Sequence, residues 1–270
     1  MAFASSADGD AEPVRVIAGQ ATLLSRTSHY ISVDPVHDEI VTTNPFAEAI
    51  LFFRGGADGE EPPIRVIQGP KTMLTGPDNV SVDPIHNELF VALRGKANAI
   101  LVFDREASGD VAPKRILRGP KTRMTQPQRA EPDPINNLLV VSNRAEPTKG
   151  ILIFNRTDSG DVAPKAIISG PKTGMNGVKR LVVYPEGKKI FALVKSAIAL
   201  NPEREGVNFI GVWNYSDNGD VPPYAMLSAS ATTKLETPGG IGLNPEAKEI
   251  IVDGGGSPAA LLVYHLPEVF

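Results

Sequence analysis

Short runs of β-branched and aromatic residues alternate with turn residues along the whole chain. In one clear stretch these runs are Ile64–Gln68, Asn79–Asp83, Leu89–Leu93 and Ile100–Asp104. Apolar runs of this kind, bounded by glycine, proline and aspartate, predict short β-strands. The loops between them are short, so consecutive strands must be antiparallel neighbours. The stretch therefore predicts a four-stranded meander.

The same pattern returns through the chain. A Gly-Asp or Gly-Glu pair, followed two or three residues later by proline, recurs about every 50 residues. The copies are Gly9-Asp10, Gly59-Glu60, Gly109-Asp110, Gly160-Asp161 and Gly219-Asp220. One such unit cannot bury its own apolar faces and needs a neighbour on each side. The sequence predicts one all-β domain over residues 1–270, a five-bladed β-propeller of four-stranded antiparallel blades.

The phase of the repeats predicts how the propeller closes. The first strand, Val14–Ala18, corresponds to the fourth strand of a unit, and the last, Leu261–His265, corresponds to a third. Pairing the N-terminal strand with the last blade would complete that blade and remove two exposed sheet edges. An open solenoid is the alternative, but it requires polar terminal caps that neither end provides.

The repeat motifs resemble those of the NHL family and its lactonase-like relatives. The residues that carry the resemblance are Val80-Ser81-Val82-Asp83, Leu89-Phe90-Val91 and Ile100-Leu101-Val102-Phe103-Asp104, with counterparts in all five units. The resemblance implies a β-propeller fold and does not by itself imply an activity. Members of these families usually have six blades, so the five units found here depart from the family pattern.

The composition sets limits on size and chemistry. With 270 residues and 41% apolar residues, the chain is long enough to bury a core without disulfides, and it contains no cysteine. Thiolate catalysis and zinc–thiolate sites are therefore excluded. No apolar run approaches the ~18 residues of a membrane span, and the residues before Asp10 are too few for a signal peptide. We expect a soluble monomer. The compartment stays open, and an exported or periplasmic protein whose leader has been removed fits as well.

Charge separates by the face on which the loops emerge. The loops between the second and third strands, and those joining successive units, are rich in lysine and arginine, whereas the other loops are acidic. A basic face at the propeller axis favours anionic ligands. The prediction is a ligand-binding propeller that captures an anionic small molecule, a glycan or an acidic protein segment. The candidate binding residues are His29, Tyr30, Arg94, Arg129, Arg144, Lys179, Arg180 and Lys195.

The alternative is a calcium-dependent lactonase or another hydrolase, and whether the protein is an enzyme stays open. Glu131 lies inside a predicted strand where the other units have Ser32, Ser81, Val182 and Gly242, so either Arg129 or a metal must compensate its charge. The lactonase resemblance implies a divalent ion on the axis, held by oxygen ligands of the type that calcium prefers. The candidate ligands are Glu131, Asn44, Asn79, Asn143 and Asp253.

Several other conspicuous residues have a structural explanation. Trp213 aligns with Phe53, Phe103 and Phe154, which predicts a core aromatic residue. The Gly-Pro-Lys-Thr copies that begin at Gly69, Gly119 and Gly170 lack the spacing of a phosphate-binding loop. Nucleic acid is not expected as a partner, because the axial mouth offers few aromatic residues for base stacking beyond Tyr30.

Overall fold

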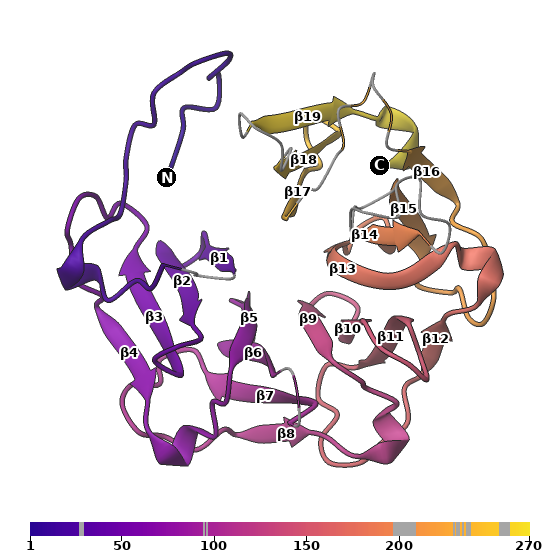
Figure 1. The fold of residues 1–270 in the computed structure, drawn as a ribbon, viewed down its shortest axis with the longest axis horizontal. Coiled ribbons are helices and arrows are strands. Elements are labelled where there is room, and N and C mark those ends of the chain that lie inside the picture. Colours follow the sequence, from indigo (N-terminus) through magenta and orange to yellow (C-terminus); the bar gives the residue numbers. More distant parts are fainter. Residues whose placement is uncertain are drawn as a thin grey trace. The chain divides into compact units, whose positions relative to one another are not determined.

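The chain forms five antiparallel sheets, one for each repeat, which confirms the five-bladed β-propeller fold (Figure 1). A computed structural model describes residues 1–26, 30–93, 95, 97–196, 209–228, 230, 233, 235, 239–253 and 260–270, with the backbone alone at 195 and 196. The described residues form two compact units, Met1–Leu93 with Leu101–Arg115, and Arg94–Ile100 with Ile116–Phe270. In this part of the chain no helix is long and apolar enough to cross a membrane.

The first two sheets are simple meanders, in which each strand pairs with the next along the chain. The first sheet contains β1 (Ile31–Asp34), β2 (Glu39–Asn44), β3 (Ala49–Arg54) and β4 (Arg65–Gln68). The second contains β5 (Pro77–Asp83), β6 (Glu88–Leu93), β7 (Ala99–Asp104) and β8 (Arg115–Leu117). These strands confirm the runs expected from the sequence.

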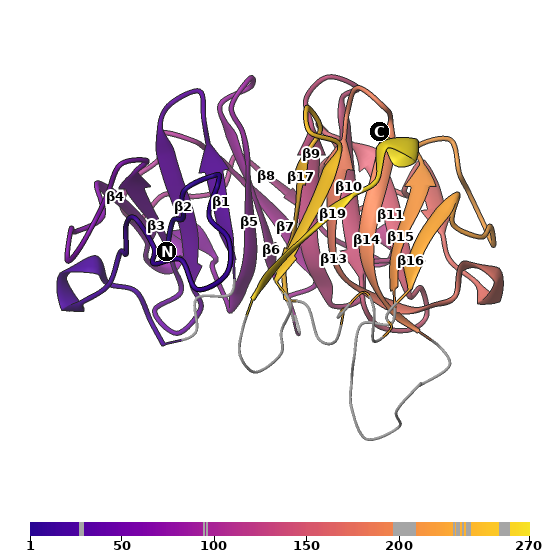
Figure 2. The same cartoon turned by 90° about the horizontal axis from the view of Figure 1, so that it is seen from above.

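The remaining sheets follow the same order, and Figure 2 shows β14, β15 and β16 running side by side. The third sheet contains β9 (Pro127–Asp133), β10 (Leu138–Asn143), β11 (Gly150–Asn155) and β12 (Ala166–Ile168). The fourth contains β13 (Met175–Tyr184), β14 (Lys189–Ser196), β15 (Phe209–Asn214) and β16 (Ala225–Ser228). The fifth contains β17 (Ile241–Asn244), β18 (Glu249–Asp253) and β19 (Leu261–His265).

In the described residues, helical structure consists of single turns of 3-10 helix before, between and after the strands. These turns are η1 (Gln20–Thr22), η2 (Pro70–Thr72), η3 (Pro120–Thr122), η4 (Pro171–Thr173) and η5 (Pro267–Val269). The Gly-Pro-Lys-Thr copies are therefore turns between strands, and in each the threonine hydroxyl donates a hydrogen bond to the glycine carbonyl. This placement agrees with the expectation that they are not phosphate-binding loops.

Among the described residues the fifth sheet contains three strands, β17 to β19. The fourth strand predicted for it, Val14–Ala18, belongs to the first compact unit, so its pairing with the last blade stays a prediction. Ile17 forms a parallel bridge with Gly59, whose amide donates to the Val16 carbonyl at 2.8 Å. The fourth strands of other repeats bridge the next repeat in the same way, as at Ile67 and Gly109. The segment thus keeps the contact of a fourth strand with the repeat that follows it.

The Gly-Asp motif is a latch between successive repeats. The Gly109 amide donates to the Val66 carbonyl at 2.7 Å, and the Gln68 amide donates to the Gly109 carbonyl at 3.1 Å. The neighbouring Asp110 carboxylate accepts the Lys71 amide of η2 at 2.7 Å. The latch recurs with Glu60 on Ala21, Asp161 on Lys121 and Asp220 on Lys172. It ties the outer edge of one sheet and the following turn to the next repeat.

The latch also corrects the assignment of charge to faces. The Gly-Asp pairs lie in the connections between the third and fourth strands, such as that from β7 to β8, and these connections are among the acidic loops that we expected on the face opposite the loops joining successive units. Asp110 instead contacts the 3-10 turn in one of those joining loops, because the connection from β7 to β8 first folds back along β4. The separation of charge between faces is therefore weaker than the sequence predicted, since these acids lie among the basic turns.

One glycine is required by this geometry. Gly69 has φ of +133°, and a Cβ added there would lie 2.5 Å from the Asp110 carboxyl carbon. An L-residue would be strained by the backbone and would also collide with the latch. The glycine before each of the three Gly-Pro-Lys-Thr turns is consequently part of the inter-repeat junction.

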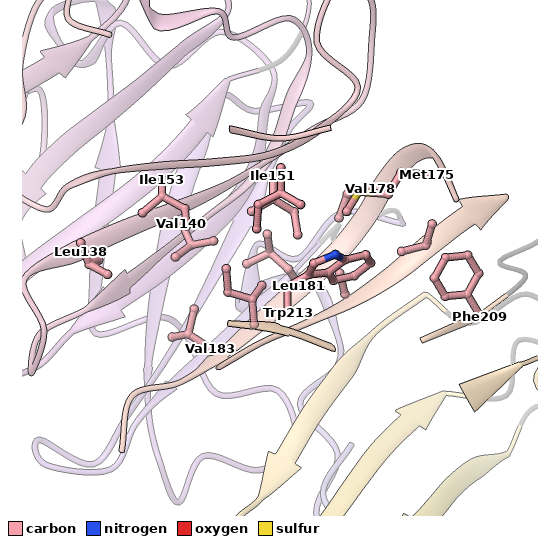
Figure 3. Close-up of a cluster of buried hydrophobic side chains, with 14 residues drawn as sticks. Leu138, Val140, Ile151, Ile153, Met175, Val178, Leu181, Val183, Phe209 and Trp213 are labelled. Atoms are coloured by element: carbon pink, nitrogen blue, oxygen red, sulfur yellow. The ribbon is translucent and has the colours of Figure 1, made fainter. Parts of the chain in front are cut away.

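The third and fourth sheets share a hydrophobic core (Figure 3). Trp213 on β15 has no exposed surface and lies among side chains such as Ile151 and Leu181, which come from β11 and β13. The Trp213 indole nitrogen lies 3.4 Å from the Val221 carbonyl, so its polar atom also has a partner. The prediction that Trp213 is a core aromatic residue is confirmed.

A buried carboxylate connects the first two sheets. Glu39 on β2 is 7% exposed and accepts two bonds from the Arg65 guanidinium, at 2.6 and 2.8 Å. The Arg105 guanidinium, which follows β7, adds a bond at 3.0 Å. Hydrogen bonding from Arg65 is the main cause that lowers the pKa of the Glu39 carboxyl, with Arg105 contributing and burial opposing the shift.

We predict that the Asp110→Ala variant is less stable than the wild type by about 1 kcal/mol, as for the loss of a helix cap. The Lys71 amide would lose its acceptor, while Asp110→Asn keeps an oxygen in place and should lose less. Urea unfolding measures both. Equal losses in the two variants would contradict the role of the carboxylate oxygen.

The Glu39 ion pairs predict a pH dependence of stability. Because the folded pKa of Glu39 is lowered, its contribution is present above the unfolded pKa and is lost as the pH falls through the folded pKa. The Glu39→Gln variant should be less stable by about 3 kcal/mol at pH 7, since it leaves the buried Arg105 guanidinium and the partly buried Arg65 guanidinium without their carboxylate. Urea unfolding should show this difference shrinking at acid pH. Glu61→Gln, which breaks the exposed pair with Arg54, is the control and should have a much smaller effect.

Candidate anion-binding site

Four basic residues lie on or next to neighbouring strands of the third and fourth sheets. Arg129 lies on β9, Arg144 directly follows β10, and Lys179 and Arg180 lie on β13. The strands β9 and β13 are neighbours in space and lie side by side in Figure 1. Basic residues from the third and fourth repeats, which are far apart in sequence, therefore lie on contacting strands.

Arg129 is held by the one carboxylate of the cluster. Its Nε donates to the Glu131 carboxylate at 2.6 Å, and its side chain is 6% exposed. The Arg129 amide donates to the Ser142 hydroxyl at 3.0 Å, which fixes the start of the strand. The out-of-pattern glutamate is thus compensated by the nearby arginine, one of the two ways expected from the sequence.

Gln128 links the two sides of the cluster. In the orientation that satisfies both amide atoms, it donates to the Lys179 carbonyl at 3.1 Å and accepts from Arg144 Nη1 at 3.2 Å. Arg180 Nη1 also donates to the Lys179 carbonyl, at 2.8 Å. Gln128 was not among the predicted binding residues, because these were chosen by charge. Its position next to Arg129 in the sequence was the signal that could have identified it.

Four of the eight predicted binding residues, Arg129, Arg144, Lys179 and Arg180, form the described cluster. Tyr30 belongs to the first compact unit, where its carbonyl accepts the Thr42 hydroxyl at 2.6 Å. His29 and Arg94 lie outside the described residues, as does the side chain of Lys195. The described part of the candidate site thus consists of Gln128, Arg129, Glu131, Arg144, Lys179 and Arg180.

Two of the predicted metal ligands are used as loop clamps. The Asn44 amide donates to the Leu23 carbonyl at 2.8 Å and accepts the Ala47 amide at 3.2 Å. Asn143 accepts the Thr125 amide at 2.6 Å and donates to the Thr148 carbonyl. A polar residue at the end of the second strand therefore fixes the adjacent loops.

The other candidate ligands also have protein partners. The Asp253 carboxylate accepts the Gly239 amide, and Asn79 Oδ1 lies 3.3 Å from the Ser81 hydroxyl. Among the described residues, no three histidine, aspartate or glutamate side chains gather as a metal site. The fifth candidate, Glu131, is the residue paired with Arg129. The calcium site stays a prediction.

That prediction has a direct measurement. A calcium site that includes Glu131 requires a rise in melting temperature when calcium chloride is added, because a ligand bound only to the folded state stabilises it. The Glu131→Gln variant should abolish the rise, and magnesium chloride at equal ionic strength is the control. No calcium-specific rise, together with no stoichiometric divalent ion in elemental analysis, would contradict the site.

Comparison with known proteins gives the fold and no family. No family model and no curated protein matches the chain. Among solved structures, a chain of the mitotic checkpoint complex matches with 16% identity and a TM-score of 0.59, over 88% of this chain and 63% of that one. A chain of a nidogen/laminin complex matches with 11% identity and a TM-score of 0.61, over 89% of this chain and 76% of that one. At these identities the similarity concerns the fold alone.

A third similar structure is itself a β-propeller domain. It is that of Cps50 (Swd1) from Myceliophteria thermophila, with 12% identity and a TM-score of 0.56, over 85% of this chain and 62% of that one. This chain therefore spans less than two thirds of that propeller and of the mitotic checkpoint chain. The resemblance to the NHL and lactonase-like families is not confirmed by a matching family model, whereas the propeller fold is supported.

Proposed function

We propose that this protein is a binding propeller that captures an anionic ligand at the cluster formed by β9, β13 and the end of β10. The observation that carries the proposal is a cluster of four basic residues on contacting strands: Arg129 is paired with Glu131, Gln128 joins Arg144 to the Lys179 carbonyl, and Arg180 donates to the same carbonyl. A net positive charge on partly buried side chains attracts anions and is screened less than one on an open surface.

The side chains of this cluster suit oxyanions. Guanidinium groups bind carboxylate, sulfate or phosphate through paired hydrogen bonds, which provide orientation as well as attraction. Arg129 and Gln128 are held by neighbours within the cluster, so part of the binding surface is already ordered. The chemistry shared by an acidic small molecule, an anionic glycan and an acidic protein segment is an oxyanion of this kind.

The proposal is for binding without catalysis. Among the described residues of the cluster, the side chains are four cations, one amide and a carboxylate held by arginine, with no neighbouring pair of nucleophile and base. Two of the similar propeller structures, the mitotic checkpoint and nidogen/laminin structures, are complexes, which supports a role as a binding scaffold.

Titration calorimetry with citrate, a heparin tetrasaccharide and a polyglutamate peptide tests the proposal and separates the three ligand classes. The Lys179→Gln/Arg180→Gln variant should bind the preferred anion about tenfold more weakly or worse, with a smaller salt dependence, since it loses two charge-assisted contacts. Lys71→Gln removes an exposed lysine on η2 and is the matched control. Unchanged affinity in the double variant, or no binding of any of the three probes, would overturn the function.

A further inference from the structure

The first two sheets present exposed aliphatic side chains at the tips of equivalent turns. Val36 lies in the turn from β1 to β2 and is 66% exposed, and Ile85 lies in the turn from β5 to β6 and is 62% exposed. Exposed apolar residues that stand alone need no explanation, but a pair held close together marks a candidate interaction surface.

These two turns are fixed beside each other by Arg105. Its guanidinium contacts Glu39 in the first sheet at 3.0 Å and donates from Nε to the Asn87 side chain, in the second turn, at 2.9 Å. The Arg105 amide donates to the Asn87 carbonyl at 3.0 Å. The two aliphatic tips therefore belong to one rigid surface of the first compact unit.

The turns themselves do not require aliphatic side chains. Asp34 Oδ1 accepts the backbone amides of Val36 and His37, both at 3.0 Å, and Asp83 does the same in the second turn. The equivalent positions are Ile135 in the third repeat, which is 59% exposed, and Glu186 and Glu246 in the fourth and fifth, in turns of the same length after proline. Glutamate is thus tolerated at this position of the fold, and burial does not explain valine or isoleucine in the first two repeats.

The surroundings of the two tips are acidic. Asp38 is exposed in the first turn, and Glu106, with a side chain 74% exposed, lies 3.0 Å from Arg105. The neighbouring cations have acidic partners: Arg65 pairs with Glu39, Arg105 with Glu106, Arg115 with Glu88, Arg54 with Glu61, and Lys114 lies 3.7 Å from Asp104. The turn aspartates Asp34, Asp38 and Asp83 add to these acids, so the formal charge around the tips is negative. A second copy of this surface would bring like charges together, whereas a cationic partner would not.

We propose that the Val36 and Ile85 turns form a docking surface for a basic, apolar protein segment. The aliphatic tips supply the central contacts, and Asp38 and Glu106 attract lysine or arginine side chains around them. This surface is independent of the anion-binding cluster, which lies in the other compact unit and has the opposite charge.

The test uses the whole protein and three labelled peptides of equal length, with alternating Lys-Leu, Lys-Ser and Glu-Leu sequences. Fluorescence anisotropy gives the affinity of each peptide for the wild type, Val36→Glu/Ile85→Glu and Met73→Glu. The double variant copies the residues of the fourth and fifth repeats, so folding should survive, and circular dichroism checks this. Met73, also exposed, lies before the opposite end of β5, so its variant is the matched control.

The Lys-Leu peptide should bind the wild type and Met73→Glu equally and bind the double variant about tenfold more weakly, because two apolar contacts are lost. The added glutamates would strengthen purely electrostatic binding, so weaker binding can arise only from the apolar tips. Lys-Ser and Glu-Leu should each bind the wild type less tightly than Lys-Leu. Equal binding of Lys-Leu to the double variant would overturn the proposal. So would wild-type dimerisation, in sedimentation experiments, that the double variant abolishes.

Discussion

The hydrogen bonds of the Gly-Asp latch are the constraint on which the described structure depends. A four-stranded sheet of this size buries too little apolar surface to be stable alone. At each latch, two backbone bonds join the outer strand of one repeat to a glycine of the next, and a carboxylate fixes the following 3-10 turn. The third and fourth sheets, which share the core around Trp213, are also joined by such a latch, between Ile168 and Gly219.

A second contact between repeats is made by the residue two positions after the core aromatic residue. Its position is the same in each repeat, but the type of side chain differs. Arg105 follows the core aromatic residue of the second repeat and reaches the Glu39 carboxylate of the first. The equivalent residue of the fourth repeat is Tyr215, whose pKa is raised by burial and further by Asp133 of the third. In the fifth repeat it is Leu266, which packs in the same apolar cluster as Tyr184. Polar positions therefore meet polar partners, and an apolar position meets an apolar one.

The strands and the core were predictable from the sequence, because alternation of apolar residues and repetition depend on local chemistry and alignment. The pairing of Arg129 with Glu131 was also within reach, since the two residues are close in sequence. The position of Asp110 was not, because the connection before β8 folds back along the preceding repeat and no strand pattern records that path. Gln128 was missed because its role comes from orientation rather than charge.

The recurrence of one junction bears on how such a chain can grow. Each latch joins backbone groups of one repeat to a glycine and an acid of the next. It therefore requires no particular side chain at other positions of the repeat. A duplicated repeat would contain both sides of the latch, namely the fourth-strand backbone groups and the Gly-Asp pair. Tandem gene duplication would then lengthen the protein without requiring a new type of contact between repeats. The exposed turn tips of each copy would be able to diverge.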